Sequence, residues 1–368
     1  MCSASPGHDA PPPPPRARRR LSMLLSSLDQ STEGHRHRGA MHGHSPHHRQ
    51  STRTLPLKVG TRGSPLALWQ TRHFLELITK VCPLLREVKA FEECVIATSG
   101  DKIQDKRLAD IGGKGLFAKE IHEALLDGRV DFAVHSMKDL ETELPPGIVL
   151  ACALKREDSR DAIVTGPDCA GVDRDDPYAC LPRGALIGTA SVRRQSQLLH
   201  ARPDLQVEII RGSVQSRLSK VRAEGGPQAS LLAIAGLKRL EMAHEAAVVL
   251  DAETMVPAAC QGIVGVTVRA DDVELRELLS AIEDGEAASV SAAERALLGS
   301  LDGSCRTPIG GHAQVMPDGQ LLLTGLVARA DGSFLLKRKL WGAKADAAAM
   351  GRELGESLRR DSPADIFG

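Results

Sequence analysis

Three times along the chain, a short apolar run is followed by a serine-bearing turn and then by a helical pattern. The runs are LKVGT at 57–61, ALIGT at 185–189 and VEIIR at 207–211, and the turns contain Ser64, Ser191 and Ser213. Serine is a good N-terminal cap, and Pro65 suits the first position of the helix after Ser64. Strands that alternate with helices form parallel sheets with right-handed crossovers. The chain is therefore constrained to an α/β fold.

Further apolar and alternating patterns extend this fold. They predict strands over 93–98, 130–134, 148–154 and 230–235, and helices over 116–126, 286–299 and 345–359. After residue 308 three alternating strands follow, separated by Asp318-Gly319 and Asp331-Gly332, which suit tight hairpins. The C-terminal part is therefore predicted to be a small antiparallel α+β domain.

Several polar segments are expected to be irregular. Residues 1–54 are rich in proline, arginine and histidine and have few apolar side chains to bury, which predicts a disordered extension. A transit peptide, loose metal binding by the histidines and a start codon placed too early remain alternatives for this segment. Residues 99–115 predict a mobile loop, residues 165–183 a second loop, and the charged segment 155–161 a crossover between lobes.

Composition argues against several classes of function. Lysines plus arginines number 47, as do aspartates plus glutamates, so no net field favours nucleic acid or an anionic membrane. Aromatic residues are 2% of the chain, too few for a platform that stacks single-stranded bases. The eight cysteines form no CxxC pair, which indicates reduced thiols in a cytosol rather than a zinc site. No apolar run reaches the roughly 18 residues of a membrane span.

The apolar run 130–134 ends abruptly in polar residues. His135, Ser136, Met137, Lys138 and Asp139 follow it directly. In open α/β sheets, ligands bind at the carboxyl ends of the strands, because the loops that leave this edge line a crevice. Asp139 is therefore the first candidate for a catalytic group. An exposed Lys138-Asp139 ion pair is the alternative, because such pairs are common and weak.

Arginines gather at the starts of the predicted helices and in the turns before them. They are Arg62, Arg193, Arg194, Arg211 and Arg217. A cation at a helix N-terminus is unfavourable by about 0.3–1 kcal/mol, because the helix dipole already places positive charge there. Guanidinium groups bind carboxylates and phosphates through two parallel hydrogen bonds. The set therefore predicts a ligand with several carboxylates or phosphates, and ordinary surface ion pairs are the alternative.

Cys305 lies in the loop between the predicted helix 286–299 and the C-terminal strands. Arg306 is its neighbour, and a nearby cation favours the thiolate, which is the nucleophilic form of cysteine. Cys305 is therefore a candidate for covalent chemistry. An inert buried thiol is the alternative.

Seven motifs follow one another along the chain. They are RGSPLALWQ (62–70), GGKGLFAKE (112–120), VHSMKDL (134–140), TASVRRQSQL (189–198), IRGSVQSRLSK (210–220), AGLKRL (235–240) and GSCRTPIGG (303–311). In order and spacing this set resembles the porphobilinogen deaminase family, also called hydroxymethylbilane synthase. The resemblance runs from residue 57 to the C-terminus and leaves out only the N-terminal extension.

The resemblance implies a three-domain architecture. It consists of two lobes like those of periplasmic binding proteins, with mainly parallel sheets joined by two crossovers, and a small α+β domain with a three-stranded antiparallel sheet. The expected boundaries are an extension at 1–54, a first lobe at 55–155 and 262–281, a second lobe at 156–261, and a C-terminal cofactor-attachment domain at 282–368.

The resemblance also implies a reaction. Four porphobilinogen molecules are condensed head to tail, with release of ammonia, onto a dipyrromethane cofactor held through a thioether on Cys305, which gives the tetrapyrrole hydroxymethylbilane. Asp139 matches the catalytic carboxylate of the family. The matches expected to bind substrate or cofactor are Arg62, Ser64, Lys138, Arg156, Ser191, Arg193, Arg194, Arg211, Arg217 and Arg239. A cytoplasmic monomer with no metal, nucleic acid or membrane partner is expected.

The chemistry of the residues agrees with this expectation. Each pyrrole unit carries two carboxylates, so a growing chain requires many fixed cations. Loss of ammonia leaves a cation-like azafulvene, which a carboxylate stabilises through the pyrrole N–H groups. The neighbouring cations favour the ionised form of Asp139, which suits a charge stabiliser better than a general acid.

Three positions depart from the family pattern. Cys260 stands where glycine is usual, Glu141 replaces a usual proline, and Asp110 lies where lysine is frequent. They are expected to alter mobility or rate without removing a principal catalytic group. A binding protein for a polycarboxylate, with the same bilobed fold and no chemistry, is the alternative function. A nucleic-acid-binding module is weaker, because the net charge is zero.

Overall fold

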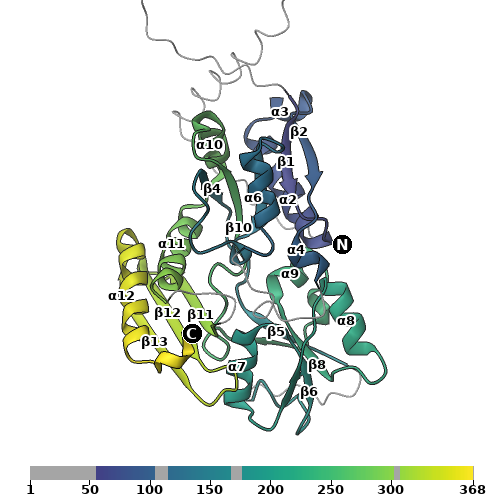
Figure 1. The fold of residues 1–368 in the computed structure, drawn as a ribbon, viewed down its shortest axis with the longest axis vertical. Coiled ribbons are helices and arrows are strands. Elements are labelled where there is room, and N and C mark those ends of the chain that lie inside the picture. The colour runs from purple at the N-terminus through teal and green to yellow at the C-terminus, as the bar shows by residue number, and fades with distance from the viewer. Residues whose placement is uncertain (1–54, 104–114, 167–175, 302–306, 368) are drawn as a thin grey trace, which may run out of the picture.

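The computed structural model describes residues 55–103, 115–166, 176–301 and 307–367, which form three sheets and the helices that cover them (Figure 1). The first sheet contains, in spatial order, β2 (Phe91–Val95), β1 (Leu57–Thr61), β3 (Phe132–Ser136), β10 (Val264–Arg269) and β4 (Ile148–Ala153). The second contains β7 (Gln206–Glu208), β6 (Leu186–Gly188), β8 (Ala229–Ala233), β5 (Asp161–Thr165) and β9 (Val248–Leu250). The third contains β11 (Ile309–Val315), β12 (Gln320–Ala328) and β13 (Leu335–Ala343).

The first two sheets have the same strand pattern. In each, one strand runs antiparallel to its neighbours: β10 pairs in this way with β3 and β4, and β5 with β8 and β9. The chain passes from β4 in the first sheet directly to β5 in the second, and from β9 back to β10. Two crossovers therefore connect two lobes with mainly parallel sheets, and the predicted fold class is confirmed.

Helices cover both faces of the first sheet. The helices of this lobe are α2 (Pro65–Val81), α3 (Leu84–Glu87), α4 (Ser99–Lys102), α6 (Lys119–Leu126) and α10 (Val273–Leu279). Phe132 and Val134 of β3 pack with Phe74 of α2, whereas Ala133 packs with Ile121 of α6. Because β3 is buried on both faces, it is an almost continuous apolar run, as a central parallel strand requires.

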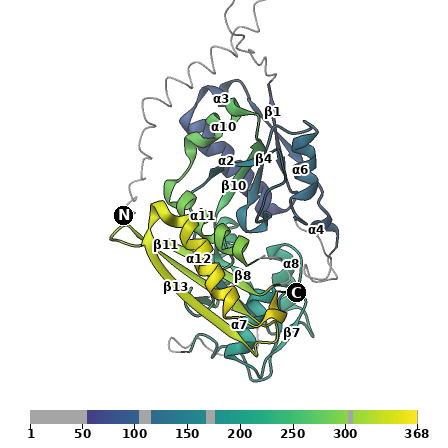
Figure 2. The ribbon, with the colours of Figure 1, turned by 60° about the vertical axis from the view of Figure 1, so that its left-hand side comes forward.

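The second lobe and the C-terminal domain have their own helices. They are α7 (Val192–Ala201), α8 (Val214–Arg222) and α9 (Ile234–Arg239) in the second lobe, and α11 (Gly285–Ser300) and α12 (Ala347–Arg360) in the C-terminal domain. Figure 2 shows α11 and α12 lying against the third sheet. The three-stranded antiparallel sheet predicted after residue 308 is confirmed, with hairpins at both Asp-Gly dipeptides.

The serine-bearing turns cap their helices as predicted for Ser64. The hydroxyl oxygens of Ser64, Ser191 and Ser213 accept hydrogen bonds from the backbone N–H groups at the third following position, at 3.3, 3.4 and 3.2 Å. These bonds satisfy N–H groups that have no partner inside the helix. The caps therefore fix the three turns at the carboxyl ends of β1, β6 and β7.

Several predicted boundaries were wrong. β3 spans Phe132–Ser136 rather than 130–134, β2 ends at Val95, and α6 begins at Lys119. The segment predicted as a mobile loop begins with the short helix α4, and residues 104–114 lie outside the described part. The predicted crossover 155–161 ends in the first residue of β5, a strand that the sequence did not indicate because its first residue is Asp161.

Candidate active site

A cavity of about 1250 Å3 lies where the two lobes and the C-terminal domain meet. Its wall includes Arg62 after β1, Asp139 after β3 and Ser191 after β6, all at carboxyl ends of parallel strands. Ile309 and Ile366 contribute from the C-terminal domain. The structure therefore places Asp139 at the sheet edge where a ligand was expected to bind.

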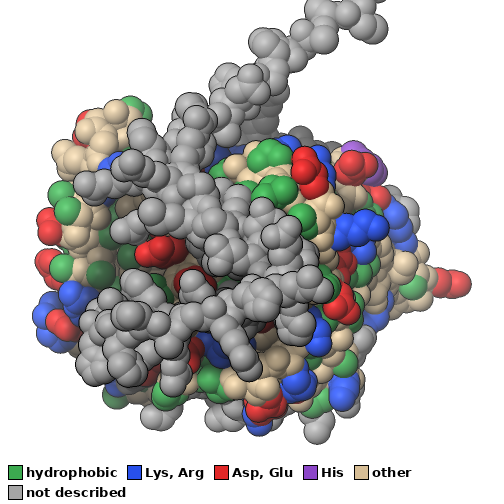
Figure 3. Space-filling view, turned by 90° about the horizontal axis from the view of Figure 1, so that it is seen from above, with side chains coloured by type: hydrophobic (Ala, Val, Ile, Leu, Met, Phe, Trp, Pro, Cys, Tyr) green, Lys and Arg blue, Asp and Glu red, His purple; other side chains and the backbone are tan. Residues whose placement is uncertain are grey.

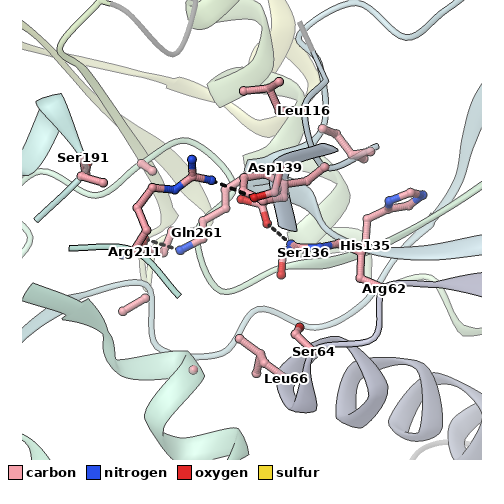
Figure 4. Close-up of a pocket in the computed structure, with 18 of the residues that line it drawn as sticks. Arg62, Ser64, Leu66, Leu116, His135, Ser136, Asp139, Ser191, Arg211 and Gln261 are labelled. Carbon is pink, nitrogen blue, oxygen red and sulfur yellow. Dashed lines mark hydrogen bonds and ion pairs between the residues drawn. The ribbon is translucent and has the colours of Figure 1, made fainter. Parts of the chain in front are cut away.

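Asp139 ends a short turn, η1 (Met137–Asp139), that follows β3. Its Oδ2 lies 3.4 Å from Nη1 of Arg62, with 29% of the aspartate side chain and 21% of the arginine side chain exposed. Figure 4 shows both residues at the cavity, close to Ser136 at the end of β3. A carboxylate is thus accessible from the cavity, and its one ion pair with a described residue is this long contact to Arg62.

Arg62 has two neighbours that the sequence did not reveal. Asp101 of α4 accepts from Nε at 3.1 Å and from Nη2 at 2.5 Å, and the ring of Phe117 lies 4.1 Å from the guanidinium carbon. Burial opposes ionisation of Asp101, but the bonds from Arg62 hold its pKa below the usual value. The only sequence signal for Phe117 was its place in the motif GGKGLFAKE.

Lys138 is exposed to the cavity and bonds to a different partner from its neighbour Asp139. Its Nζ donates to Oε1 of Gln261 at 3.1 Å. Desolvation by the surrounding wall and the nearby Arg194 lower the pKa of Lys138 to about 8, although Asp139 and Asp161 oppose this shift. An amine with this pKa changes its charge close to neutral pH, so its binding of anions depends on pH.

Arg193 and Arg194 already hold a carboxylate of the protein. Nη2 of Arg193 lies 2.7 Å from Oδ2 of Asp161, and Nη2 of Arg194 lies 2.8 Å from Oδ1. Their remaining Nη1 atoms donate to the carbonyl oxygens of Val256 and Leu231. Burial would raise the pKa of Asp161, but the two arginines outweigh it and hold this pKa far below the usual range. Both arginines nevertheless form part of the cavity wall.

Arg211 and Arg217 face the cavity from the second lobe. Nη2 of Arg211 donates to the carbonyl oxygen of Gly100 at 2.9 Å, which links the two lobes, and Nε of Arg217 donates to Gly212 at 3.0 Å. Burial and the neighbouring arginines lower the pKa of Arg217 to about 10. Within the described residues, no carboxylate forms an ion pair with Arg217, so its charge is available to an anion.

Arg156 and Arg239 lie behind the wall rather than in it. Arg156 donates from Nε to the carbonyl oxygen of Gln261 at 2.8 Å, and Nη2 of Arg239 donates to that of Gly262 at 2.6 Å. Gln261 in turn donates from Nε2 to Oδ1 of Asp161 at 2.8 Å. These two cations therefore hold the second crossover in place.

Cys260 begins this segment with an unusual backbone. Its φ is +61°, in the left-handed region where glycine is favoured, and its side chain is 2% exposed. Burial raises the pKa of its thiol to about 12. Cys260 is therefore an inert thiol at a position whose conformation suits glycine. Cys305, Arg306 and Asp110 lie outside the described residues.

Glu294 of α11 holds the crossovers to the C-terminal domain through a fully buried carboxylate. It accepts from Nη1 of Arg156 at 2.6 Å and from the backbone N–H groups of Cys260 and Ala313. We expect Glu294→Gln to lower the free energy of unfolding by about 3–5 kcal/mol, because it leaves the Arg156 charge buried without a counter-ion. Chemical denaturation measures this loss.

Glu253 provides the control for this prediction. It pairs with Lys337 and Lys339 at the surface, and its side chain is 53% exposed. Glu253→Gln should change the free energy of unfolding by less than about 1 kcal/mol. If the two variants lost equal stability, the buried pair would not be the structural link inferred here.

Other classes of site have little support in the described part. No group of three or more His, Cys, Asp or Glu residues there could hold a metal ion, and none of its helices combines the length and apolar character needed to cross a bilayer. Figure 3 shows basic and acidic side chains interspersed on the described surface of one face. The cavity wall itself contains Arg62, Arg193, Arg194, Arg211, Arg217 and Lys138, which could bind an anionic ligand.

Comparisons with known proteins agree with this geometry. Residues 57–277 match the family model described as "Porphobilinogen deaminase, dipyromethane cofactor binding domain", and residues 288–360 match "Porphobilinogen deaminase, C-terminal domain". The chain is 46% identical over 312 residues to "Porphobilinogen deaminase" of Paracoccus denitrificans, covering 85% of this chain and 96% of that protein. It is 45% identical over 312 residues to "Porphobilinogen deaminase, chloroplastic" of Pisum sativum, covering 84% and 82%. Among solved structures, the Bordetella pertussis BvgS periplasmic VFT2 domain aligns with a TM-score of 0.37 and 19% identity over 65% of this chain and 92% of that one.

Proposed function

The chain belongs to the porphobilinogen deaminase family, and we propose that the cavity around Asp139 and Arg62 is where its reaction takes place. The reaction condenses four porphobilinogen molecules head to tail, with loss of ammonia, onto a dipyrromethane cofactor, and yields a linear tetrapyrrole of porphyrin and heme biosynthesis. The observation that carries the proposal is a solvent-accessible carboxylate in a cavity whose other charged groups are mostly arginines.

Cations of the wall hold the carboxylates of substrate and cofactor. Arg217 is the strongest candidate, because within the described residues it has no acidic partner, and Arg62 and Arg211 face the same cavity. Ser64 and Ser191 also form part of the wall. Guanidinium groups bind carboxylates through two parallel hydrogen bonds, and partial burial strengthens this attraction relative to bulk water.

Asp139 stabilises the cation that forms when ammonia leaves the aminomethyl group of the substrate. The bond from the methylene carbon to nitrogen breaks, the nitrogen leaves with the electron pair, and positive charge spreads over the pyrrole ring. A carboxylate that accepts the pyrrole N–H lies where this charge develops, which lowers the barrier.

Cys305 holds the dipyrromethane through a thioether. When bound, this cofactor supplies the pyrrole carbon that attacks the first substrate unit. Thr307 and Ile309, which follow Cys305 in the chain, form part of the cavity wall, so a group attached nearby lies within reach of the wall's arginines. The volume of about 1250 Å3 exceeds that of most small-molecule sites and suits a chain of several pyrroles.

Arg156, Arg193, Arg194 and Arg239 act chiefly through other residues. Arg156 and Arg239 fix the backbone of the second crossover. Arg193 and Arg194 pair with Asp161, so a ligand carboxylate must share them with this residue. The resemblance implied that all four bind substrate or cofactor, and the roles proposed here are less direct for Arg156 and Arg239.

The domain division follows the sheets and their cores. We place the first lobe at 55–155 and 262–281, the second at 156–261 and the C-terminal domain at 282–368, which is supported by β5 beginning at Asp161 and α11 at Gly285. A cytoplasmic monomer is the proposed working form. The free thiols among the described residues support a reducing compartment, and the monomeric state is carried over from the family resemblance; these thiols are Cys82, Cys94, Cys152, Cys180 and Cys260.

One assay separates this function from the alternative of a polycarboxylate-binding protein. Incubation of the purified protein with porphobilinogen should release ammonia and linear tetrapyrrole in a ratio of four to one. A protein that binds porphobilinogen, as calorimetry would detect, but releases no ammonia would instead support the binding function.

The charge of Lys138 predicts the pH dependence of substrate capture. Because its pKa is about 8 in the free protein, the ammonium is lost as pH rises through 8, and carboxylate binding weakens. We expect kcat/KM to fall above about pH 8. Lys138→Arg should move this fall to higher pH, because a guanidinium stays charged throughout the accessible range.

Stability should change in the opposite direction over the same range. The pKa of Lys138 is 10.5 when unperturbed and about 8 when folded, so between these values the unfolded chain binds more protons. The free energy of unfolding therefore gains a contribution from Lys138 as pH rises from about 8 to 10.5.

The kinetic prediction has its own contradicting outcome. If the kcat/KM profile of Lys138→Arg coincided with the wild-type profile, the fall above pH 8 would not be due to Lys138.

A further inference from the structure

Glu141 follows Asp139 by two residues and forms part of the cavity wall. Only 7% of this side chain is exposed. The preceding residue, Leu140, is also buried, and its N–H donates to the carbonyl oxygen of Met137 at 3.1 Å. Glu141 is therefore the first charged side chain that anchors the chain after Asp139.

The carboxylate of Glu141 lies between two neighbours in the first lobe, although its Oε2 has no hydrogen-bond partner among the described residues. Its Oε2 lies 3.5 Å from Nδ1 of His122 in α6, a side chain that is 2% exposed. Its Oε1 lies against Gly115, because a Cβ built on this glycine would be only 1.8 Å away. The carboxylate thus joins the loop after β3 to α6 and to the turn that precedes α6.

The C-terminal domain holds the same loop through its backbone. Nη2 of Arg295 in α11 donates to the carbonyl oxygens of Glu141 and Thr142 at 2.8 and 2.7 Å. Before the turn, the N–H of Met137 donates to the carbonyl oxygen of Ile263 at 3.0 Å. Both flanks of Asp139 are therefore anchored, whereas its own carboxylate has only the long contact to Arg62.

The charges around Glu141 favour an ionised carboxylate. Burial would raise its pKa, but His122 and Arg295 outweigh burial and hold the pKa below the usual value. His135 of β3 lies behind His122, with ring centroids 5.6 Å apart. Neither ring nitrogen of His122 has a hydrogen-bond partner among the described residues. Glu141 is therefore the main polar neighbour of this imidazole.

We infer that Glu141 is a positioning residue for Asp139: its buried carboxylate, wedged between His122 and Gly115, fixes the loop that places the Asp139 carboxylate in the cavity. The inference rests on the role proposed for Asp139. Small displacements of a reacting or stabilising group are costly, so a residue that acts through another can change kcat.

Charge-removing variants test this inference. Glu141→Gln keeps the shape of the side chain, and we expect it to lower kcat about tenfold, because a loosely held Asp139 is misplaced. KM should change by less than about twofold, because carboxylate binding is left intact. His122→Phe should have a similar effect, and the double variant should lose little more than either single one. His122→Asn, which keeps an N–H donor near the place of Nδ1, should retain most of kcat.

Glu143 offers a matched control, because it lies in the same loop with its side chain exposed to solvent. Glu143→Gln should keep the wild-type kcat. If Glu141→Gln lowered the melting temperature but not kcat, Glu141 would be a structural residue only and the inference would be wrong. An equal tenfold loss in an Asp139→Asn background would also overturn it, because Glu141 would then not act through Asp139. Near-normal turnover of Asp139→Asn alone would instead overturn the role proposed for Asp139.

Discussion

Asp139→Asn is expected to lower kcat by a factor of about 10²–10³, because it removes the negative charge that stabilises the cation formed when ammonia leaves. The amide has nearly the same size and still accepts a hydrogen bond from a pyrrole N–H, so substrate binding should change little. A loss in kcat with little change in KM is the signature of an interaction that matters chiefly in the transition state. Steady-state assay of ammonia release measures both constants.

The stability of this variant should remain close to that of the wild type. The contact between Asp139 and Arg62 is 3.4 Å long and partly exposed, so its loss should cost less than about 1 kcal/mol. Asp131→Asn is a matched control, because Asp131 also pairs with an arginine, Arg269, at 3.7 Å and has 25% of its side chain exposed. This control pair lies outside the cavity wall, and the variant should keep the wild-type kcat.

Two results would contradict the role of Asp139. If Asp139→Asn kept near-normal kcat, the carboxylate would not stabilise the reaction. If the loss appeared entirely in KM, Asp139 would contribute to binding rather than to the chemical step. In that case the role of Arg62 in substrate binding would have to be reconsidered, because its guanidinium group already donates two hydrogen bonds to Asp101.

Local patterns were sufficient to predict much of the fold. Ser64 followed by Pro65 predicted a helix start that the structure confirms, and the two Asp-Gly dipeptides predicted the hairpins of the third sheet. β5 was missed because it begins with Asp161, a charged residue inside a charged segment. A buried carboxylate at a strand start is stable only because Arg193 and Arg194, more than 30 residues away, neutralise it. No local pattern carries that information.

The same distinction applies to the candidate site. Asp139 could be predicted, because it follows an apolar strand, and the position of a strand end is a local property. The partners of the arginines could not be predicted, because they come from remote segments: Glu294 for Arg156 and Asp101 for Arg62. Sequence therefore indicated that cations gather at helix starts, but not which of them the protein already neutralises.

The structure divides these cations into two groups with different consequences. Arg156, Arg193 and Arg194 are paired with buried carboxylates, so removing them should chiefly cost stability. Arg217 lies in the cavity wall and is unpaired within the described residues. Desolvation of its charge therefore lowers the stability of the free protein. An anion that binds beside it relieves this cost, which is a physical reason for the cavity to bind a polycarboxylate.

Cys305→Ala is expected to abolish turnover, because without a thioether no dipyrromethane is held and the first substrate unit has no acceptor. The intact mass of the purified wild type should exceed the mass of its sequence by two linked pyrrole units, and the variant should lack this excess. Circular dichroism of the variant should retain the α/β signal, which would show that the loss of turnover is not a loss of folding. Cys260→Gly is the control: its thiol is buried with a pKa of about 12, so its loss should leave the mass excess unchanged.

The possible masses have different meanings. An excess that persists in Cys305→Ala and disappears in another cysteine variant would move the attachment point away from Cys305. An excess that is absent from the wild type, even after incubation with porphobilinogen, would contradict covalent cofactor attachment and favour a binding protein. The expected result would establish Cys305, in the C-terminal part of the chain, as the attachment point, whereas Asp139 belongs to the first lobe. Arg295 bonds α11 to the loop after Asp139 and so links the C-terminal domain to the first lobe.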